Sequence, residues 1–232
     1  MAEYIFTLSS GEEIPVVITA RRGMRNITLR PKTAPSRAIH ISRPWLVSDS
    51  AAIKFMLSKQ KWIECIFQKC PSKVHLKSGD VIEFLDRQVQ LIHTPEIRAN
   101  RFSDDGTELY VGGGEDMFER RVRDVVKNEF LKELKEMVRS APREFWPRRI
   151  AIRDTTSRWG SCSSSGTMSF SWRLAFAPRD VMRYVVMHEL AHKKHMDHSP
   201  EFWAQVAELY GFGVERAKRW LAQHGGELHR YF

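Results

Sequence analysis

The sequence predicts an α+β protein, with a β-rich N-terminal region followed by a region in which helices accompany a small sheet. Short β-branched and aromatic segments, separated by turn residues, fill the first half of the chain. Apolar residues at helical spacing dominate the second half. The chain has 232 residues, of which 42% are hydrophobic and 28% charged, as in a globular protein rather than a disordered or fibrous one.

The N-terminal region is predicted to contain several short strands and one helix. Ser-Gly, Arg-Gly and Pro-containing turns bound the first four strands, over 4–8, 14–20, 26–30 and 37–42. A helix is predicted over 50–68 because apolar residues recur there near helical spacing, and Pro71 closes it. Further strands are predicted over 81–85, 88–93 and 108–111.

Three successive glycines, Gly112 to Gly114, mark the predicted domain boundary, because they end a strand and favour flexibility. The predicted domains are therefore residues 1–112 and 113–232, which could also form one continuous domain. In the second, a long amphipathic helix is predicted over 116–139. Alternating strands follow over 149–153 and 168–174, and then helices over 178–192, 199–211 and 214–224.

No segment predicts a membrane partner or an oxidising compartment. No stretch reaches the roughly 18 to 20 apolar residues that span a bilayer, and residues 1–10 lack the pattern of a secretory signal. The three cysteines, Cys65, Cys70 and Cys162, have no metal-ligand or disulfide-framework spacing. We therefore expect a cytoplasmic protein.

The formal charge of +9 raises the question of a polyanionic partner. The densest basic stretch runs from residue 21 to residue 43 without an acid. It contains Arg21, Arg22, Arg25, Arg30, Lys32, Arg37 and Arg43. This stretch could bind the phosphates of a nucleic acid or form an ordinary solvated strand face.

Residues 188–192 read His-Glu-Leu-Ala-His inside a predicted helix, which is an HExxH motif. Two histidines four positions apart lie on one helical face, so His188 and His192 can bind one metal ion together. A catalytic zinc usually takes three protein ligands and leaves a fourth position to water. His198 lies beyond the turn that separates this helix from the next, and it is the predicted third ligand of one Zn²⁺ per chain.

Glu189 lies beside the first predicted ligand, where a carboxylate can reach a metal-bound water. A closed structural zinc site, or hydrogen-bonded histidines without metal, would have no need of an acid there. We therefore predict a catalytic centre in which zinc lowers the pKa of its water to about 7. Glu189 is then the general base and passes the proton to the departing amine of a peptide or protein substrate.

The strand before the metal-binding helix is the predicted wall of the substrate cleft. An exposed edge there would let an extended peptide add as a further strand, whereas a covered edge would make it an ordinary half-buried strand. The candidate substrate-binding residues are Met168, Ser169, Phe170, Ser171 and Trp172. Candidates for a second donor to the oxyanion are Arg158, His195 and Tyr210. Cys162 is expected to be a small buried thiol.

Taken together, the motifs resemble those of the YgjP-like metallopeptidase family, which are predicted metal-dependent hydrolases related to SprT-like and other HExxH peptidases. The resemblance rests on RWGSC at 158–162, WRLAFAP at 172–178, HELAH at 188–192 and HSPEFW at 198–203. It implies a zincin-like catalytic region with His188, His192 and His198 as zinc ligands and Glu189 as catalytic acid and base. His195 stands where metzincins have a glycine, so membership of that group is not expected.

Two other functions stay open at this point. One is a zinc-dependent amidase or other hydrolase that acts on a non-peptide substrate. The other is a DNA-associated protease, or a nucleic-acid-binding module, that uses the basic surface. The resemblance does not decide between substrates.

Overall fold

The computed structural model describes residues 4–33, 36–69, 73–155 and 157–232, and the chain forms two compact units. Unit 1 is Met1–Lys73 and unit 2 is Val74–Phe232. Strands and helices occur in both, so the mixed α+β class is confirmed. Cys70 and Pro71, named above, lie outside the described residues.

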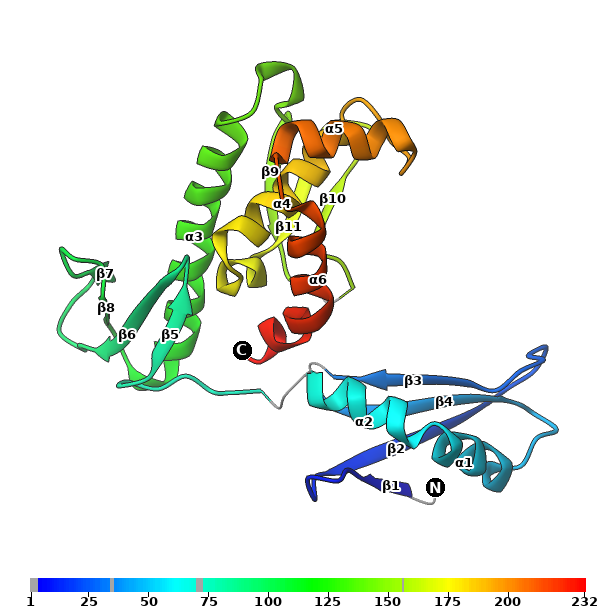
Figure 1. The fold of residues 1–232 in the computed structure, drawn as a ribbon. Coiled ribbons are helices and arrows are strands. Elements are labelled where there is room, and N and C mark those ends of the chain that lie inside the picture. Colours follow the sequence, from blue (N-terminus) through cyan, green and yellow to red (C-terminus); the bar gives the residue numbers. More distant parts are fainter. Residues whose placement is uncertain (1–3, 34–35, 70–72, 156) are drawn as a thin grey trace. The chain divides into compact units, whose positions relative to one another are not determined.

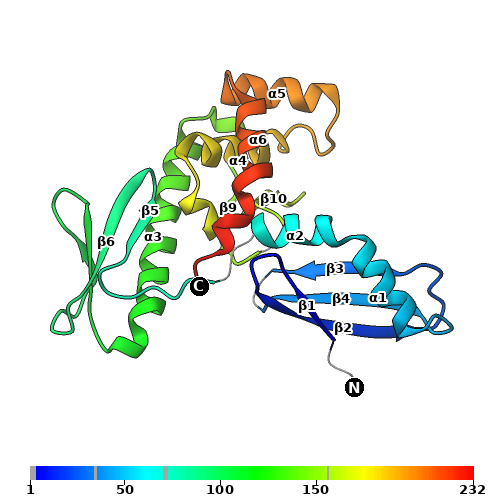
Figure 2. The same ribbon diagram turned by 60° about the horizontal axis from the view of Figure 1, so that its bottom comes forward.

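Unit 1 is a four-stranded sheet with two helices on one of its faces (Figures 1 and 2). Its elements are β1 (Tyr4–Thr7), β2 (Glu13–Arg21), β3 (Thr28–Lys32), β4 (Ala38–Pro44), α1 (Asp49–Ser58) and α2 (Gln60–Lys69). The strand order is β1-β2-β4-β3, and only β2 and β4 run parallel. The inward side chains alternate along the strands and pack under the helices, as with Ile14, Ile39 and Ile41 beneath Met56 and Phe67.

The single helix predicted over 50–68 is in fact two. Lys59 leaves helical geometry, with φ of −106° and ψ of 14°, between the end of α1 and the start of α2. Just before it, the Ser58 hydroxyl donates to the Phe55 carbonyl at 2.6 Å, a local bond that competes with the helical backbone pattern.

In its described residues, unit 2 contains two small sheets and four α-helices. The first sheet, of order β5-β6-β8-β7, is formed by β5 (Val81–Phe84), β6 (Arg87–His93), β7 (Arg101–Phe102) and β8 (Glu108–Val111). The second, of order β10-β11-β9, is formed by β9 (Arg149–Arg153), β10 (Gly160–Cys162) and β11 (Thr167–Ser171). The helices are α3 (Phe118–Arg139), α4 (Arg179–Ala191), α5 (Pro200–Tyr210) and α6 (Val214–His224). The short 3₁₀ helices are η1 (Glu115–Met117), η2 (Arg143–Phe145), η3 (Trp172–Phe176) and η4 (Gly225–His229).

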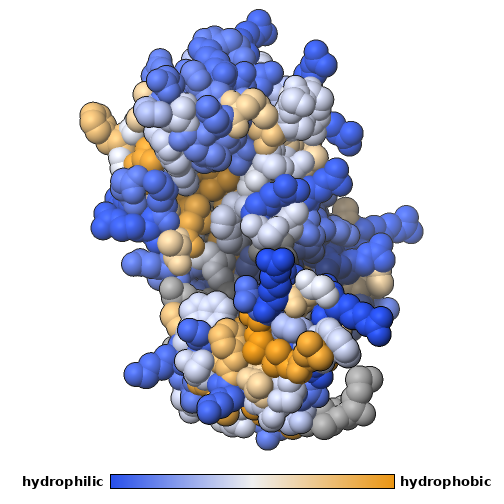
Figure 3. Space-filling view, turned by 90° about the vertical axis from the view of Figure 1, so that its right-hand side faces the viewer, coloured by the Kyte–Doolittle hydropathy of each residue, from blue (hydrophilic) through white to orange (hydrophobic). Residues whose placement is uncertain are grey.

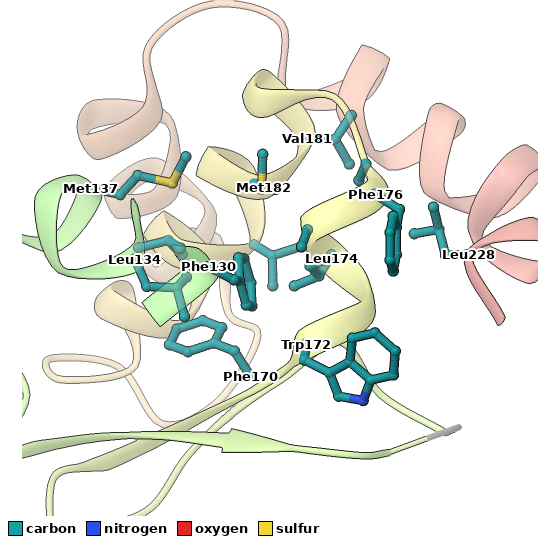
Figure 4. Packing of buried hydrophobic residues seen from close by; sticks show 14 of the residues in the cluster. Phe130, Leu134, Met137, Phe170, Trp172, Leu174, Phe176, Val181, Met182 and Leu228 are labelled. Carbon is teal, nitrogen blue, oxygen red and sulfur yellow. The ribbon is translucent and has the colours of Figure 1, made fainter. Parts of the chain in front are cut away.

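One hydrophobic core joins the elements of unit 2. Figure 4 shows Phe130 and Leu134 of α3 packed beside Phe170 of β11, with Leu174 of η3 and Met182 of α4 close by. All five side chains are at most 1% exposed. Burial of this kind contributes about 1.5 to 3 kcal/mol per large apolar side chain, so the core holds α4 firmly against the three-stranded sheet.

The division between the units falls at Lys73 and Val74, not at the three glycines. Gly112 to Gly114 do end β8, as predicted, but the sheet β5 to β8 packs against α3 and shares its core. Val111 and Val122, on either side of the glycines, are both fully buried in that core. The predicted boundary therefore lies inside unit 2, because the apolar face of α3 packs against the sheet formed by β5 to β8.

No helix in the described part of the chain is long and apolar enough to cross a membrane.

Candidate metal centre

The helix α4 places His188 one turn before His192. Pro178 precedes the helix, and the backbone N–H of Arg179 in its first turn donates to both carboxylate oxygens of Asp86 at 3.1 Å. Most of α4 is buried, so its position is fixed by the core. His192 is the residue that caps its C-terminus, so the HExxH motif ends where the helix ends.

The next helix begins as the sequence predicts and returns His198 to the motif. The Ser199 hydroxyl accepts from the N–H of Phe202 at 3.4 Å, Pro200 follows at the first helical position, and Gly211 ends α5 with φ of 89°. His198 lies directly before this cap. Its Nε2 is 3.3 Å from Nε2 of His188, and one nitrogen of each of His188, His192 and His198 lies within 4.8 Å of the other two.

Hydrogen bonding and burial prepare these imidazoles to offer lone pairs. Nδ1 of His192 lies 2.9 Å from the carbonyl oxygen of His195, to which it donates its hydrogen. The other ring nitrogen, Nε2, then carries the free lone pair. Burial, followed by the charges of His192, His198 and Lys218, lowers the pKa of His188 to about 4, which keeps this ring neutral at pH 7.

Aromatic side chains that the sequence analysis did not single out form the wall behind the three histidines. Phe202 is fully buried, and the centroid of its ring lies 4.5 Å from that of His192, 4.8 Å from that of His198 and 4.9 Å from that of His188. Trp203 and Tyr184 also contact His188, with ring centroids 5.7 and 5.9 Å away. The signal for Tyr184 was present in the sequence, since it lies one helical turn before His188.

Glu189 is buried beside the three histidines, with only 5% of its surface exposed. Burial raises its pKa to about 7, and the positive charge of Arg158 acts in the opposite direction. Its side chain lies against Gly160 of β10 so closely that a Cβ at that position would be 2.5 Å from Oε1. Only a glycine therefore allows β10 to pass this carboxylate without displacing it.

The donor set fits a zinc ion. Three imidazoles with converging nitrogens are a known set of protein ligands for catalytic zinc. Three protein ligands leave a fourth coordination position open. The buried carboxylate next to the triad has a pKa close to neutral, which suits a group that exchanges protons. His188, His192 and His198 could therefore hold a metal ion, with Glu189 beside it.

The strand before the metal-binding helix, for which an exposed and a covered edge were both considered, has no free edge. β11 is the middle strand of its sheet, antiparallel to β10 and parallel to β9, so both of its backbone edges are occupied. Of the two alternatives for the strand predicted over 168–174, the covered edge is therefore the one observed, and an exposed edge at the candidate residues 168–172 is not. Met168, Phe170, Ser171 and Trp172 are buried at 1% exposure or less, and Trp172 already belongs to η3.

The open edge belongs to β10, which the sequence analysis did not predict as a strand. Within the described residues β10 pairs with β11 alone, and it packs against α4. A cavity of about 320 Å³ borders it, lined by Arg153, Thr155, Arg158, Gly160, Ser161, Ser169 and Phe170. Of the candidate residues, Arg158, Ser169 and Phe170 line this cavity together with Gly160, the residue that lies against Glu189.

The three oxyanion candidates are placed differently. Arg158 is exposed and lowers the pKa of Glu189, and its carbonyl accepts a hydrogen bond from the Thr155 hydroxyl at 2.8 Å. His195 contributes its backbone carbonyl to His192. Tyr210 is buried and packs against Tyr184, with 5.9 Å between the ring centroids. Tyr184 in turn contacts His188, and no direct contact between Tyr210 and His188 occurs among the described ring contacts.

Cys162 at the end of β10 is partly buried. Burial, followed by the negative charge of Glu189, raises the pKa of its thiol, while Lys193 acts in the opposite direction. A raised pKa disfavours the thiolate that a nucleophile or metal ligand needs. The sequence analysis expected a small buried thiol, and the side chain is only partly buried.

The chain matches a protein-family model and is similar to a solved structure. A family model described as "YgjP-like, metallopeptidase domain" matches residues 25–224. Among solved structures, the chain is similar to the metallopeptidase zymogen abylysin of Pyrococcus abyssi, at 25% identity and with a TM-score of 0.35. That similarity covers 43% of this chain and 98% of the other. No curated protein matches the chain.

Proposed function

Because the chain belongs to the YgjP-like metallopeptidase family, we propose that it is a zinc-dependent peptidase of the HExxH type, zincin-like and related to SprT-like peptidases. In this proposal His188, His192 and His198 hold one zinc ion and Glu189 moves the protons of the reaction. The observation that carries it is the convergence of the three imidazoles beside a buried carboxylate.

The roles of the ligands follow from their settings. His192 is oriented by its hydrogen bond to the His195 carbonyl, and His188 is kept neutral by burial. The ring of Phe202 packs against all three imidazoles and excludes water from behind them. A bound zinc ion would supply Lewis acidity, which polarises a carbonyl group and lowers the pKa of a water.

Glu189 is the proton carrier. With a pKa of about 7, a carboxyl group is partly ionised at neutral pH, so it can accept a proton from the attacking water and return it to the departing amine. Its close approach to Gly160 limits the movement of the carboxylate on the side of β10. Positioned proton transfer of this kind typically contributes about 10² to 10⁴ in rate.

An extended peptide is the substrate that best fits the surroundings of the site. The open edge of β10 offers backbone hydrogen bonds to an added strand. The cavity beside it, with Ser161, Ser169 and Arg158 in its lining, would take a substrate side chain. Arg158 is also the candidate that we favour as second donor to the oxyanion, because its charge acts on Glu189.

Cleavage of a peptide library, mapped by mass spectrometry, tests this proposal. The zinc-loaded protein should cut peptide bonds, and the Glu189→Gln variant, purified in the same way, should cut the same bonds about 10² to 10⁴ times more slowly. Turnover of simple amides without any peptide cleavage would instead establish the rival function, a zinc amidase. Equal peptide cleavage by both proteins would refute the role of Glu189. We place the enzyme in the cytoplasm, in keeping with the free thiols of Cys65 and Cys162.

A further inference from the structure

The division of the chain into two units shows where its positive charge is concentrated. Residues 1–73 contain 12 Lys and Arg against 5 Asp and Glu, an excess of seven positive charges out of +9 for the whole chain. Unit 2, with more than twice as many residues, is therefore close to neutral. Unit 1 carries no part of the proposed metal centre, so its charge calls for an explanation of its own.

The helices of unit 1 cover only one face of its sheet (Figure 2). Two of the arginines in the basic stretch lie on this helix side and have acidic partners there. Arg37 pairs with Glu12 at 2.8 Å and lies over the ring of Phe67 in α2, while Arg43 pairs with Asp49 of α1 at 2.5 Å. These two therefore serve the fold of the unit.

The remaining basic residues of the strands lie on the opposite, uncovered face. The register sets Arg30 opposite His40, and His40 opposite Val17, in one row across β3, β4 and β2. Lys32, two residues beyond Arg30, and Arg21, at the end of β2, share this face because side chains two apart point the same way. Arg21, Arg30 and Lys32 are exposed and belong to none of the ion pairs of the described residues.

Hydroxyl groups lie between these cations. The row next to Arg30 consists of Thr28, Ser42 and Thr19, which the register places opposite one another on the same face. Hydroxyl side chains and cations are the groups that bind phosphate and sugar oxygens in nucleic acids. Among the described strand residues of this face, Glu13 is the single acidic one, and it lies at the end of β2 opposite to Arg21.

An exposed aromatic side chain stands at one end of the sheet. Trp45 directly follows β4, is 58% exposed, and has the guanidinium of Arg22 5.8 Å from its ring centroid. Leu46 beside it is 79% exposed. In Figure 3, the lower part of the view belongs to unit 1 and shows apolar side chains gathered among strongly hydrophilic ones. A cation beside an exposed indole is a setting in which an unpaired base can stack.

We infer that the uncovered sheet face of unit 1 binds single-stranded nucleic acid, with Arg21, Arg30 and Lys32 contacting phosphates and Trp45 stacking on a base. Charge complementarity argues for a polyanion, and the exposed indole favours a single strand, because a duplex keeps its bases stacked inside. The inference is independent of the proposed peptidase activity.

Fluorescence anisotropy with a labelled oligodeoxythymidine of about 15 nucleotides tests it on the full chain. Binding is expected in roughly the micromolar range at low salt. The combined variant Arg21→Gln, Arg30→Gln and Lys32→Gln should bind at least about tenfold more weakly. The slope of log K against log salt should become shallower by about 2, since each phosphate contact to a single strand contributes about 0.7.

A matched control removes the same charge from the helix side of the same unit. Lys54, Lys59 and Lys61 are exposed on α1, α2 and their junction, and replacing all three with Gln should leave binding within about twofold. A charge-preserving variant, Arg21→Lys, Arg30→Lys and Lys32→Arg, should also bind like the wild type. Trp45→Ala should weaken single-strand binding by about tenfold.

Several outcomes would overturn the inference. These are absence of binding, equal losses in the sheet-face and helix-side variants, tighter binding to a duplex of the same length, and binding to phosphatidylserine vesicles without binding to the oligonucleotide. Peptide cleavage by the sheet-face variant should equal that of the wild type, and an unchanged circular dichroism spectrum should show that unit 1 is still folded.

Discussion

Gly160→Ala tests whether β10 positions the carboxylate of Glu189. An alanine Cβ at this position would lie 2.5 Å from Oε1 of Glu189, 2.7 Å from its Cγ and 2.8 Å from its Cδ, whereas ordinary contacts begin near 3.4 Å. The carboxylate would therefore have to move by roughly 1 Å to restore ordinary contact, and at 5% exposure it has little free space to enter. A displacement of about 1 Å at a reacting group can cost about 10²-fold in rate.

We expect kcat/KM of Gly160→Ala to fall by about 10²-fold, which corresponds to about 2.7 kcal/mol. The assay is steady-state cleavage of a fluorogenic peptide, together with zinc content by mass spectrometry, which should stay at one ion per chain. Ser164→Ala is the control and should keep kcat, because Ser164 is exposed in the turn between β10 and β11 and lies outside the lining of the cavity. Because Gly160→Ala acts through Glu189, it should cost less than about twofold in a Glu189→Gln background. Wild-type kcat in Gly160→Ala, or loss of zinc along with activity, would refute the reasoning.

Three further predictions concern the site and its surroundings. Glu189→Gln should keep its zinc and lose about 10² to 10⁴ in rate, and turnover at the wild-type rate would contradict the assigned role. His198→Ala should lose zinc on dialysis, whereas His195→Ala should keep it, because His195 contributes only its backbone carbonyl; equal retention by both would remove His198 from the ligands. Burial, and then the positive charge of Arg173, lower the pKa of His229 to about 4, while the charge of Asp154 acts in the opposite direction. Between pH 6.5 and pH 4, His229 is therefore protonated in the unfolded chain but not in the folded protein. Stability should therefore fall as the pH drops from about 6.5 to about 4, by up to about 3 kcal/mol. Urea unfolding of His229→Gln should lack that part of the pH dependence, and identical pH profiles for the two proteins would contradict it.

Most elements of the fold follow from local patterns in the sequence. The strand over 149–153 and the helix over 214–224 have the predicted bounds, because alternation and helical spacing record which side chains are buried. Ser199 and Pro200 open α5 and Gly211 closes it for equally local reasons. The grouping of the three histidines was predictable too, since four residues make one helical turn and the start of α5 requires a turn before it.

The features that sequence patterns did not give depend on tertiary contacts. Gly112 to Gly114 look like a linker, yet the apolar face of α3 packs against the strands before them and moves the boundary to Lys73. β10 has only three residues, Gly-Ser-Cys, which carry no strand pattern, and its pairing with β11 determines which edge is open. The approach of Gly160 to Glu189 joins residues 29 positions apart, so no local pattern reports it.

Anomalous scattering at the zinc edge, on crystals of the protein, tests the central claim most directly. We expect one zinc peak per chain, about 2.0 to 2.1 Å from a nitrogen of each of His188, His192 and His198, with Glu189 beside the open coordination position. A structure without a peak at this place, or with the ring of His198 turned away and another side chain in its position, would contradict it.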